Sequence, residues 1–183
     1  KRFGSGCEIW LHGTSMGAST VLMASGLKLS PQVKGIVSDC AFTTAWDVFA
    51  HVLKDQYHLP SYPILKISDR MCREKAGYGL KQCSAALEVK KAKVPILFIH
   101  GDADTFVPCS MCFEIYENCA SKKNMLIVHG AGHVEAFYKE QVLYEQKLTE
   151  FLETAGEAWA PAGKSIYVSD VTGEGNSGES VPV

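Results

Sequence analysis

The chain has 183 residues, of which 46% are hydrophobic and 21% are charged, and its formal net charge is -2. This length and composition are typical of one globular domain with a hydrophobic core. Basic residues adjoin one another only in pairs, so the sequence lacks the basic patch expected for binding to nucleic acid or to an anionic membrane. No run approaches the roughly 18 apolar residues of a transmembrane helix, and no apolar signal region follows the N-terminal basic pair. We therefore expect a cytoplasmic protein without nucleic-acid or membrane partners.

The predicted strands are four short apolar runs, each bounded by Gly, Pro or Asp: Glu8–His12, Val33–Ser38, Val94–His100 and Met125–His129. Apolar runs of this length with such boundaries are typical of buried strands. The stretches between or after them have helical spacing. This alternation predicts the α/β class, with about four parallel strands flanked by helices on both faces.

Two predicted helices lie near the ends of the expected domain. The first is expected to run from the turn at Ser15 to about Leu27, and its nearly continuous apolar character is typical of a buried helix. The last is expected from about Ala136 to Ala155, with an apolar stripe on one side and charged residues outward.

The domain is expected to span residues 1–156. Within it, residues 46–92 form a longer excursion whose helical spacing is broken by Pro60 and Pro63, and this pattern predicts a helical cap. Residues 157–183 are polar and rich in glycine, so they cannot build a core, and we expect a disordered C-terminal tail.

Seven cysteines are scattered through apolar context: Cys7, Cys40, Cys72, Cys83, Cys109, Cys112 and Cys119. Their odd number and the lack of paired zinc-ligand spacing favour reduced, mostly buried thiols, and we expect no metal and no cofactor. Cys109 and Cys112 open a predicted helix, where the dipole could lower a thiol pKa for redox chemistry. An apolar stripe that includes Cys112 favours core packing instead.

The segment Gly13-Thr14-Ser15-Met16-Gly17 joins the first strand to the first helix without spare residues. This is the context of a nucleophile elbow, in which a strained turn lifts a serine hydroxyl clear of the sheet. We expect glycine at both ends because strand and helix approach too closely for a β-carbon. Ser15 is then the candidate nucleophile, and the backbone N–H of Met16 is a candidate oxyanion donor at the positive end of the helix. A plain Gly/Ser turn is the alternative.

A serine nucleophile needs a carboxylate that orients its base, and three aspartates follow predicted strands. Asp39 follows the second strand, and Asp102 and Asp104 follow the third. We favour Asp104, because the next helix is expected to begin near Pro108 and because Asp102 is better placed to bond its own turn.

Two histidines near the last strand are candidates for the base. His133 follows the flexible turn Gly130-Ala131-Gly132, which would let its imidazole reach back over the sheet edge, whereas His129 is expected to end the strand. We therefore favour His133 over His129, with a structural surface histidine as the alternative reading. The order Ser, Asp, His along the chain is the order found in α/β-hydrolases.

From about Cys7 to Ala155 the chain resembles the C-terminal portion of bacterial alpha/beta hydrolases of the uncharacterised esterase or serine-peptidase-like group. Four segments carry the likeness: Gly13–Ala18, Ser38–Thr43, Val94–Gly101 and Gly130–His133. The resemblance implies an α/β-hydrolase fold that cleaves a small-molecule ester, a thioester or a peptide through an acyl-enzyme.

The resemblance also implies that strands before the elbow lie outside this sequence, so we expect a fragment of a longer enzyme. The strand Glu8–His12 would then be an open edge, and Met16 would supply only one of two oxyanion donors. A serine peptidase on the same fold is one alternative function. A noncatalytic module that pairs through this edge strand is another.

Overall fold

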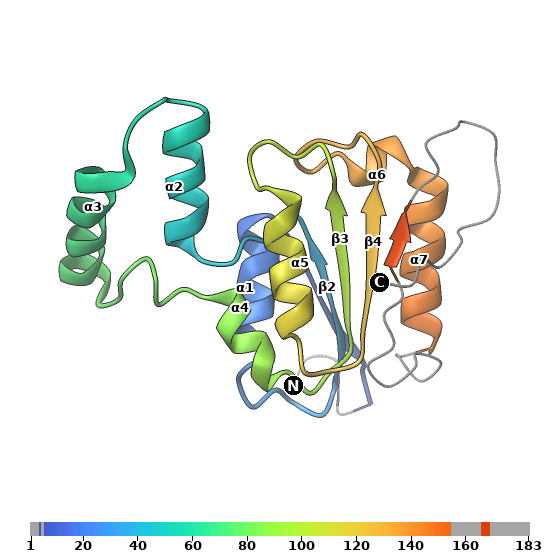
Figure 1. The fold of residues 1–183 in the computed structure, drawn as a ribbon. Helices are drawn as coiled ribbons and strands as arrows, with labels where there is room; N and C mark the ends of the chain where they lie inside the picture. Colours follow the sequence, from blue (N-terminus) through green and yellow to red (C-terminus); the bar gives the residue numbers. More distant parts are fainter. Residues whose placement is uncertain (1–3, 5, 155–165, 169–183) are drawn as a thin grey trace.

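The structure, a computed structural model, describes Gly4, residues 6–154 and residues 166–168. Its centre is a parallel sheet in the order β1-β2-β3-β4-β5 (Figure 1). The strands are β1 (Ile9–Thr14), β2 (Val33–Asp39), β3 (Ile96–Gly101), β4 (Lys123–Val128) and β5 (Ile166–Val168). The predicted α/β class with a parallel sheet is confirmed, and the bounds of β1 to β4 lie within two residues of the predicted ones.

Side chains alternate between the two faces of the sheet, and both faces are buried. In β3, Ile96 and Phe98 belong to one hydrophobic cluster, whereas Leu97 and Ile99 belong to the other. Successive residues of a strand point to opposite faces, so a strand covered on both sides must be apolar throughout. This is why the strands are continuous apolar runs rather than alternating ones.

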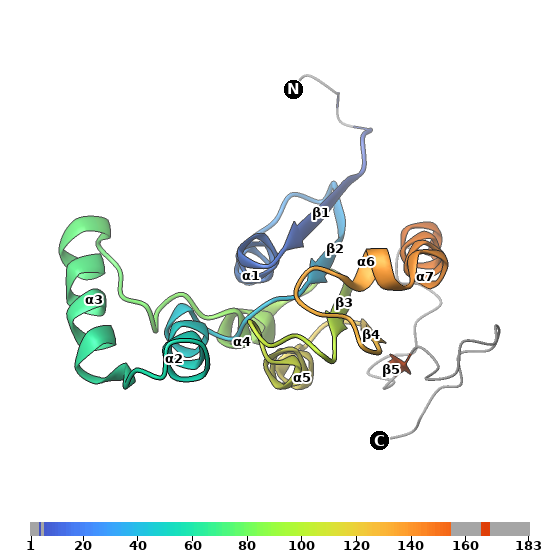
Figure 2. The same cartoon turned by 90° about the horizontal axis from the view of Figure 1, so that it is seen from above.

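Helices cover both faces of the sheet (Figure 2). On one face lie α1 (Met16–Ala24), α4 (Ala85–Glu88), the short 3-10 turn η1 (Val89–Lys91) and α5 (Cys109–Asn118). On the other lie α6 (Ala136–Lys139) and α7 (Gln141–Thr154). The single last helix of the sequence prediction is thus two helices. The first helix ends before Leu27 and buries only Ala18, Ser19 and Leu22, so it is less enclosed than its composition suggested.

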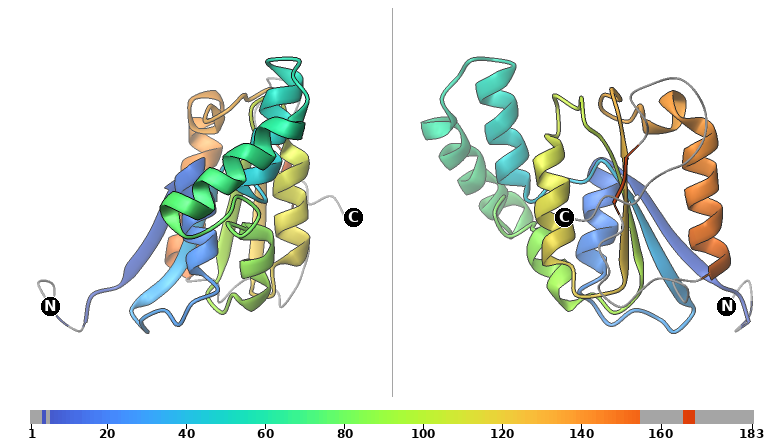
Figure 3. Two further views of the ribbon diagram at one scale, coloured as in Figure 1. Left: turned by 90° about the vertical axis from the view of Figure 1, so that its left-hand side faces the viewer. Right: turned by 45° about the vertical axis from the view of Figure 1, so that its right-hand side comes forward.

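The predicted cap is smaller than residues 46–92. Figures 1 and 3 show α2 (Ala45–Asp55) and α3 (Ser61–Ala76) standing away from the sheet. By contrast, Ala85, Ala86 and Val89 are buried in the cluster between sheet and helices. The last part of the predicted cap therefore belongs to the core layer.

The two edges of the sheet differ. The first strand, β1, is the edge of the described sheet and its apolar side chains are only half-buried, as predicted. At the other edge, β5 pairs in parallel with β4. The predicted tail, 157–183, otherwise lies outside the described residues, and Ile166–Val168 differ from the disorder expected there by forming this strand. Among the described residues, no helix has the length and apolar character needed to cross a membrane.

Candidate active site

The candidate residues lie in the loops that leave the carboxyl ends of β1, β3 and β4. Ser15 directly follows β1, Asp104 lies three residues after β3, and His133 lies five residues after β4. Because the strands are parallel, their carboxyl ends lie together at one end of the sheet, where α/β proteins commonly bind ligands. The register of β1 to β4 therefore brings together residues far apart in the sequence.

The turn at Ser15 has a strained backbone, as expected for a nucleophile elbow. Ser15 has φ 53° and ψ -115°, outside the usual regions for a residue with a β-carbon. Its backbone N–H donates to the carbonyl of Asp39 at 2.8 Å, which fixes the turn to the end of β2. The expectation for the glycines is only half right: a β-carbon at Gly13 would collide with the backbone of Gly17, but one at Gly17 would meet nothing.

The two glycines make a matched pair for a stability measurement. We expect Gly13→Ala to lower the free energy of unfolding by about 1–3 kcal/mol, because backbone must move to admit the methyl group. Gly17→Ala is expected to raise it by up to about 1 kcal/mol, since Gly17 is helical and alanine is the better helix former. Urea unfolding of both variants checks this, and equal destabilisation would contradict the steric explanation.

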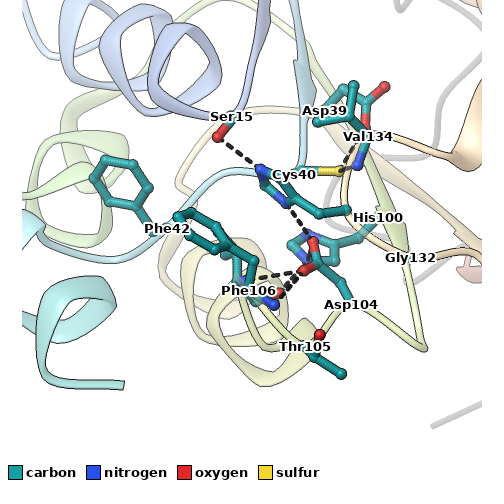
Figure 4. A network of polar contacts seen from close by, with 12 residues as sticks. Ser15, Asp39, Cys40, Phe42, His100, Asp104, Thr105, Phe106, Gly132 and Val134 are labelled. Atoms are coloured by element: carbon teal, nitrogen blue, oxygen red, sulfur yellow. Dashed lines mark hydrogen bonds and ion pairs between the residues drawn. The ribbon is translucent and has the colours of Figure 1, made fainter. Parts of the chain in front are cut away.

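Three of the candidate side chains form one chain of hydrogen bonds (Figure 4). The Ser15 hydroxyl lies 2.9 Å from Nε2 of His133. On the other side of the ring, Nδ1 of His133 lies 2.7 Å from Oδ2 of Asp104. With Nδ1 donating to the carboxylate, Nε2 carries the lone pair that can accept the proton of Ser15.

The Asp104 carboxylate is enclosed by donors. Its Oδ1 accepts the backbone N–H groups of Phe106 at 2.9 Å and Val107 at 2.8 Å. Nε2 of the buried His100 lies 3.4 Å from Oδ2 and 2.9 Å from the carbonyl of Val107. Burial by itself would raise the pKa of Asp104, but the hydrogen bonds from His100, His133 and Val107 outweigh it and hold the pKa below its ordinary value. Asp104 is therefore the ionised partner of His133.

The aspartates that were not favoured have other partners. Asp102 accepts from Nδ1 of His129 at 2.7 Å and from the backbone N–H of Gly130 at 2.7 Å. The sequence predicted that Asp102 would bond its own turn, but Asp102 instead bonds residues of the next loop. Asp104 bonds the backbone of its own turn as well as His133. The hydrogen bonds of Asp39 run to Cys40 and Tyr144, away from His133.

The first residue of α1 is Met16, whose side chain is 73% exposed. The first N–H groups of a helix have no acceptor within it and lie at the positive end of its dipole. The N–H of Met16, the oxyanion donor expected from the sequence, therefore lies at the positive end of α1, next to Ser15 in the chain.

Four side chains at the site were not recognised in the sequence: His51, Cys40, His100 and Phe106. The ring of Phe106 lies 5.0 Å from that of His133. From the cap, Nε2 of His51 reaches the carbonyl of Thr105 at 2.9 Å. His100 ends a predicted strand, so its burial could be foreseen, but its contact with Asp104 depends on how the loop folds back.

Thiolate redox chemistry fits Cys40 and Cys109 poorly. Cys40, Asp104 and His133 offer ligand atoms within 4.8 Å of one another. Asp104 and His133 already hydrogen-bond each other, and burial and the neighbouring Asp39 raise the pKa of the Cys40 thiol far above its ordinary value, so the free thiol is protonated. Burial likewise raises the pKa of Cys109 to about 12, opposite to the shift of a redox thiol.

Solved structures share this fold at low sequence identity. The acylaminoacyl peptidase of Pyrococcus horikoshii is 16% identical, with a TM-score of 0.62 over 85% of this chain and 25% of that one. An esterase of Pyrococcus furiosus is 20% identical, with a TM-score of 0.59 over 80% of this chain and 53% of that one. Acetyl xylan esterase 1 of Thermoanaerobacterium is 21% identical, with a TM-score of 0.56 over 80% of this chain and 45% of that one.

Sequence comparisons cover most of the chain. The Bacillus subtilis protein YqkD, described as uncharacterized, is 31% identical over 150 residues, which are 82% of this chain and 49% of that protein. The chain therefore spans about half the length of this relative. The model of the prolyl oligopeptidase family matches residues 2–157. With the α/β-hydrolase architecture described above, this match shows that the chain belongs to the prolyl oligopeptidase family.

Proposed function

We propose that the protein is a serine hydrolase that cleaves a carboxylic ester or thioester through an acyl-enzyme. The observation that carries this proposal is the chain of hydrogen bonds from Ser15 through His133 to the buried carboxylate of Asp104. A serine hydroxyl is a weak nucleophile until a neighbouring base takes its proton, and this arrangement supplies the base and the group that orients it.

The proposed reaction follows from the direction of these hydrogen bonds. Nε2 of His133 takes the proton as Oγ of Ser15 forms a bond with the substrate carbonyl carbon, and the Met16 N–H stabilises the resulting oxyanion. His133 then gives its proton to the leaving alcohol or thiol as the carbon–oxygen or carbon–sulfur bond breaks. A water molecule, deprotonated by His133, releases the acid and restores Ser15.

Apolar side chains around Ser15 favour a substrate with an apolar acyl group. Met16 and Phe106 are both exposed, at 73% and 39%. The close-up draws the rings of Phe42 and Phe106 with Ser15 (Figure 4), and the Phe106 ring lies 5.0 Å from that of His133. Ser19, one helical turn beyond Ser15, fixes the backbone of Phe42. The Ser19 hydroxyl accepts the N–H of Phe42 at 2.9 Å and donates to the carbonyl of Phe42 at 3.1 Å.

A serine peptidase is the second candidate. It is favoured by the family match and by the fold shared with the acylaminoacyl peptidase. Amide and ester cleavage use the same acyl-enzyme route, so the hydrogen-bonded residues would play the same parts.

Parallel assays on ester, thioester and peptide substrates separate these candidates. Short-chain nitrophenyl esters and thioesters are compared with peptide nitroanilides, each with the parent chain and with Ser15→Ala. Hydrolysis of the esters by the parent alone supports the proposed function, and faster turnover of the peptides supports the peptidase. Equal hydrolysis of the esters, thioesters and peptides by the parent and Ser15→Ala would overturn both.

A further inference from the structure

The loop that carries His133 is hydrogen-bonded to a cysteine that the proposed reaction does not use. Sγ of Cys40, the residue after β2, accepts the backbone N–H of Val134 at 3.4 Å. Val134 is the residue next to His133. The same sulfur lies within 4.8 Å of a ring nitrogen of His133 and a carboxylate oxygen of Asp104. Cys40 therefore joins the second strand to the loop of the proposed base.

Both residues of this contact have strained backbones. Cys40 has φ 59° and Val134 has φ 63°. A positive φ is uncommon for any residue other than glycine, and for a β-branched valine it is a marked outlier that surrounding contacts must hold in place. Val134 is 36% exposed, so its own burial does not supply that restraint. Two hydrogen bonds supply it: the turn bond from the N–H of Glu135 to the carbonyl of Gly132 at 3.2 Å, and the bond from the N–H of Val134 to Cys40.

The thiol is itself oriented by a buried network. It donates to Oδ1 of Asp39 at 3.0 Å, so a lone pair of the sulfur is left for the N–H of Val134. The hydroxyl of Tyr144, on α7, donates to Oδ2 of Asp39 at 3.2 Å. Cys40, Asp39 and Tyr144 are 0%, 4% and 5% exposed. Buried polar groups that are mutually satisfied form rigid networks, so this one can transmit position to the loop.

We infer that Cys40 is a positioning residue for His133, because the Asp39–Cys40–Val134 hydrogen bonds hold the loop in the strained conformation that aims Nε2 at Ser15. This inference rests on the proposed function and deepens it. Cys40 touches no reacting atom in the proposed reaction. Its effect passes through the backbone of Val134 to the neighbouring imidazole.

Three variants of the full chain test this inference. In Cys40→Ala, the Val134 N–H loses its acceptor, and in Cys40→Ser a hydroxyl can take over both hydrogen bonds. Cys119→Ala is the matched control, because Cys119 is also buried but bonds Ser121 at the end of α5. Each variant is measured for ester kcat and KM, for thermal unfolding, and for amide hydrogen exchange at Val134 by NMR.

We expect Cys40→Ala to lower kcat by about 10- to 100-fold with little change in KM, because a small displacement of the base disturbs proton transfer. Exchange at Val134 is expected to become at least about tenfold faster, as the local opening cost of the loop falls. Cys40→Ser is expected to recover most of both effects. Cys119→Ala is expected to lower the unfolding temperature without changing kcat or the exchange rate at Val134.

Unchanged exchange at Val134 in Cys40→Ala would overturn the inference, as would an equal loss of kcat in Cys119→Ala. The exchange measurement does not depend on turnover. A parent chain that hydrolyses no ester therefore contradicts the proposed function, whereas the exchange rate at Val134 tests the hydrogen bond from Cys40 separately.

Discussion

Replacement of Ser15 by alanine is expected to lower kcat for ester hydrolysis by about 10⁶-fold, the size of effect seen when a serine nucleophile is removed from a complete triad. No other hydroxyl in the described hydrogen-bond chain can form the acyl-enzyme, because the Ser15 oxygen is the one 2.9 Å from Nε2 of His133. The fold should be retained, since within the described residues the only side-chain hydrogen bond of Ser15 is the one to His133. Steady-state ester assays at matched protein concentration measure the loss.

The control for this change is Thr20→Ala on the same helix. The Thr20 hydroxyl is exposed and donates to the carbonyl of Met16 at 2.7 Å, within α1. Its removal is expected to change kcat by no more than about threefold, because surface substitutions away from a site have small effects. A comparable loss of rate in Thr20→Ala and Ser15→Ala would show that disturbance of α1, rather than loss of the nucleophile, lowers the activity.

Asp104→Asn is expected to lower kcat by about 10⁴-fold while the fold is retained. The side-chain oxygen of asparagine can still accept the N–H groups of Phe106 and Val107. Its amide group, however, would donate toward Nδ1 of His133, which favours the tautomer with the proton on Nε2. That tautomer cannot accept the proton of Ser15.

The pH dependence of stability provides a second measurement on the same variant. The folded pKa of Asp104 is below its ordinary value of 3.8, so its ionised form is favoured by folding. The stabilisation is present above 3.8 and is lost as the pH falls through the lower, folded pKa. The parent should therefore lose stability relative to Asp104→Asn in that acidic window, as measured by urea unfolding at several pH values.

Asp102→Asn is the matched control for Asp104→Asn. Asp102 lies in the same loop and also bonds a histidine, but that histidine is His129, in the next loop. We expect its replacement to leave kcat within about threefold of the parent, because the side-chain oxygen of asparagine can still accept the N–H of Gly130 and His129 takes no part in the proposed reaction. If Asp102→Asn lowered kcat as much as Asp104→Asn, the assignment of the acid to Asp104 would be wrong.

The parts of the fold that could be predicted are those that depend on local pattern. The strands β1 to β4 are short apolar runs between turn-forming residues, and such runs are typical of parallel strands buried on both faces. The extent of the cap could not be predicted. Residues 85–91 follow α2 in the same excursion between strands, and only tertiary packing places Ala85 and Val89 in the core.

The candidate site could be predicted because each residue follows a strand, and parallel strands bring their carboxyl ends together. Ser15, Asp104 and His133 are predicted on this basis. In the structure His133 lies within hydrogen-bond distance of both Ser15 and Asp104. Contacts between loops could not be predicted in this way. The bond from Cys40 to Val134 joins residues 94 positions apart, and no local pattern in the sequence pairs them.

The most direct test of the central claim, that His133 activates Ser15 as a nucleophile, is covalent labelling with a fluorophosphonate. Mass spectrometry of the digested chain then locates the adduct. We expect one adduct, on the peptide that contains Ser15, and a labelling rate at least about 10³-fold lower in His133→Ala, because the hydroxyl then has no base. An adduct on another residue, or equal labelling of the parent and His133→Ala, would contradict the claim.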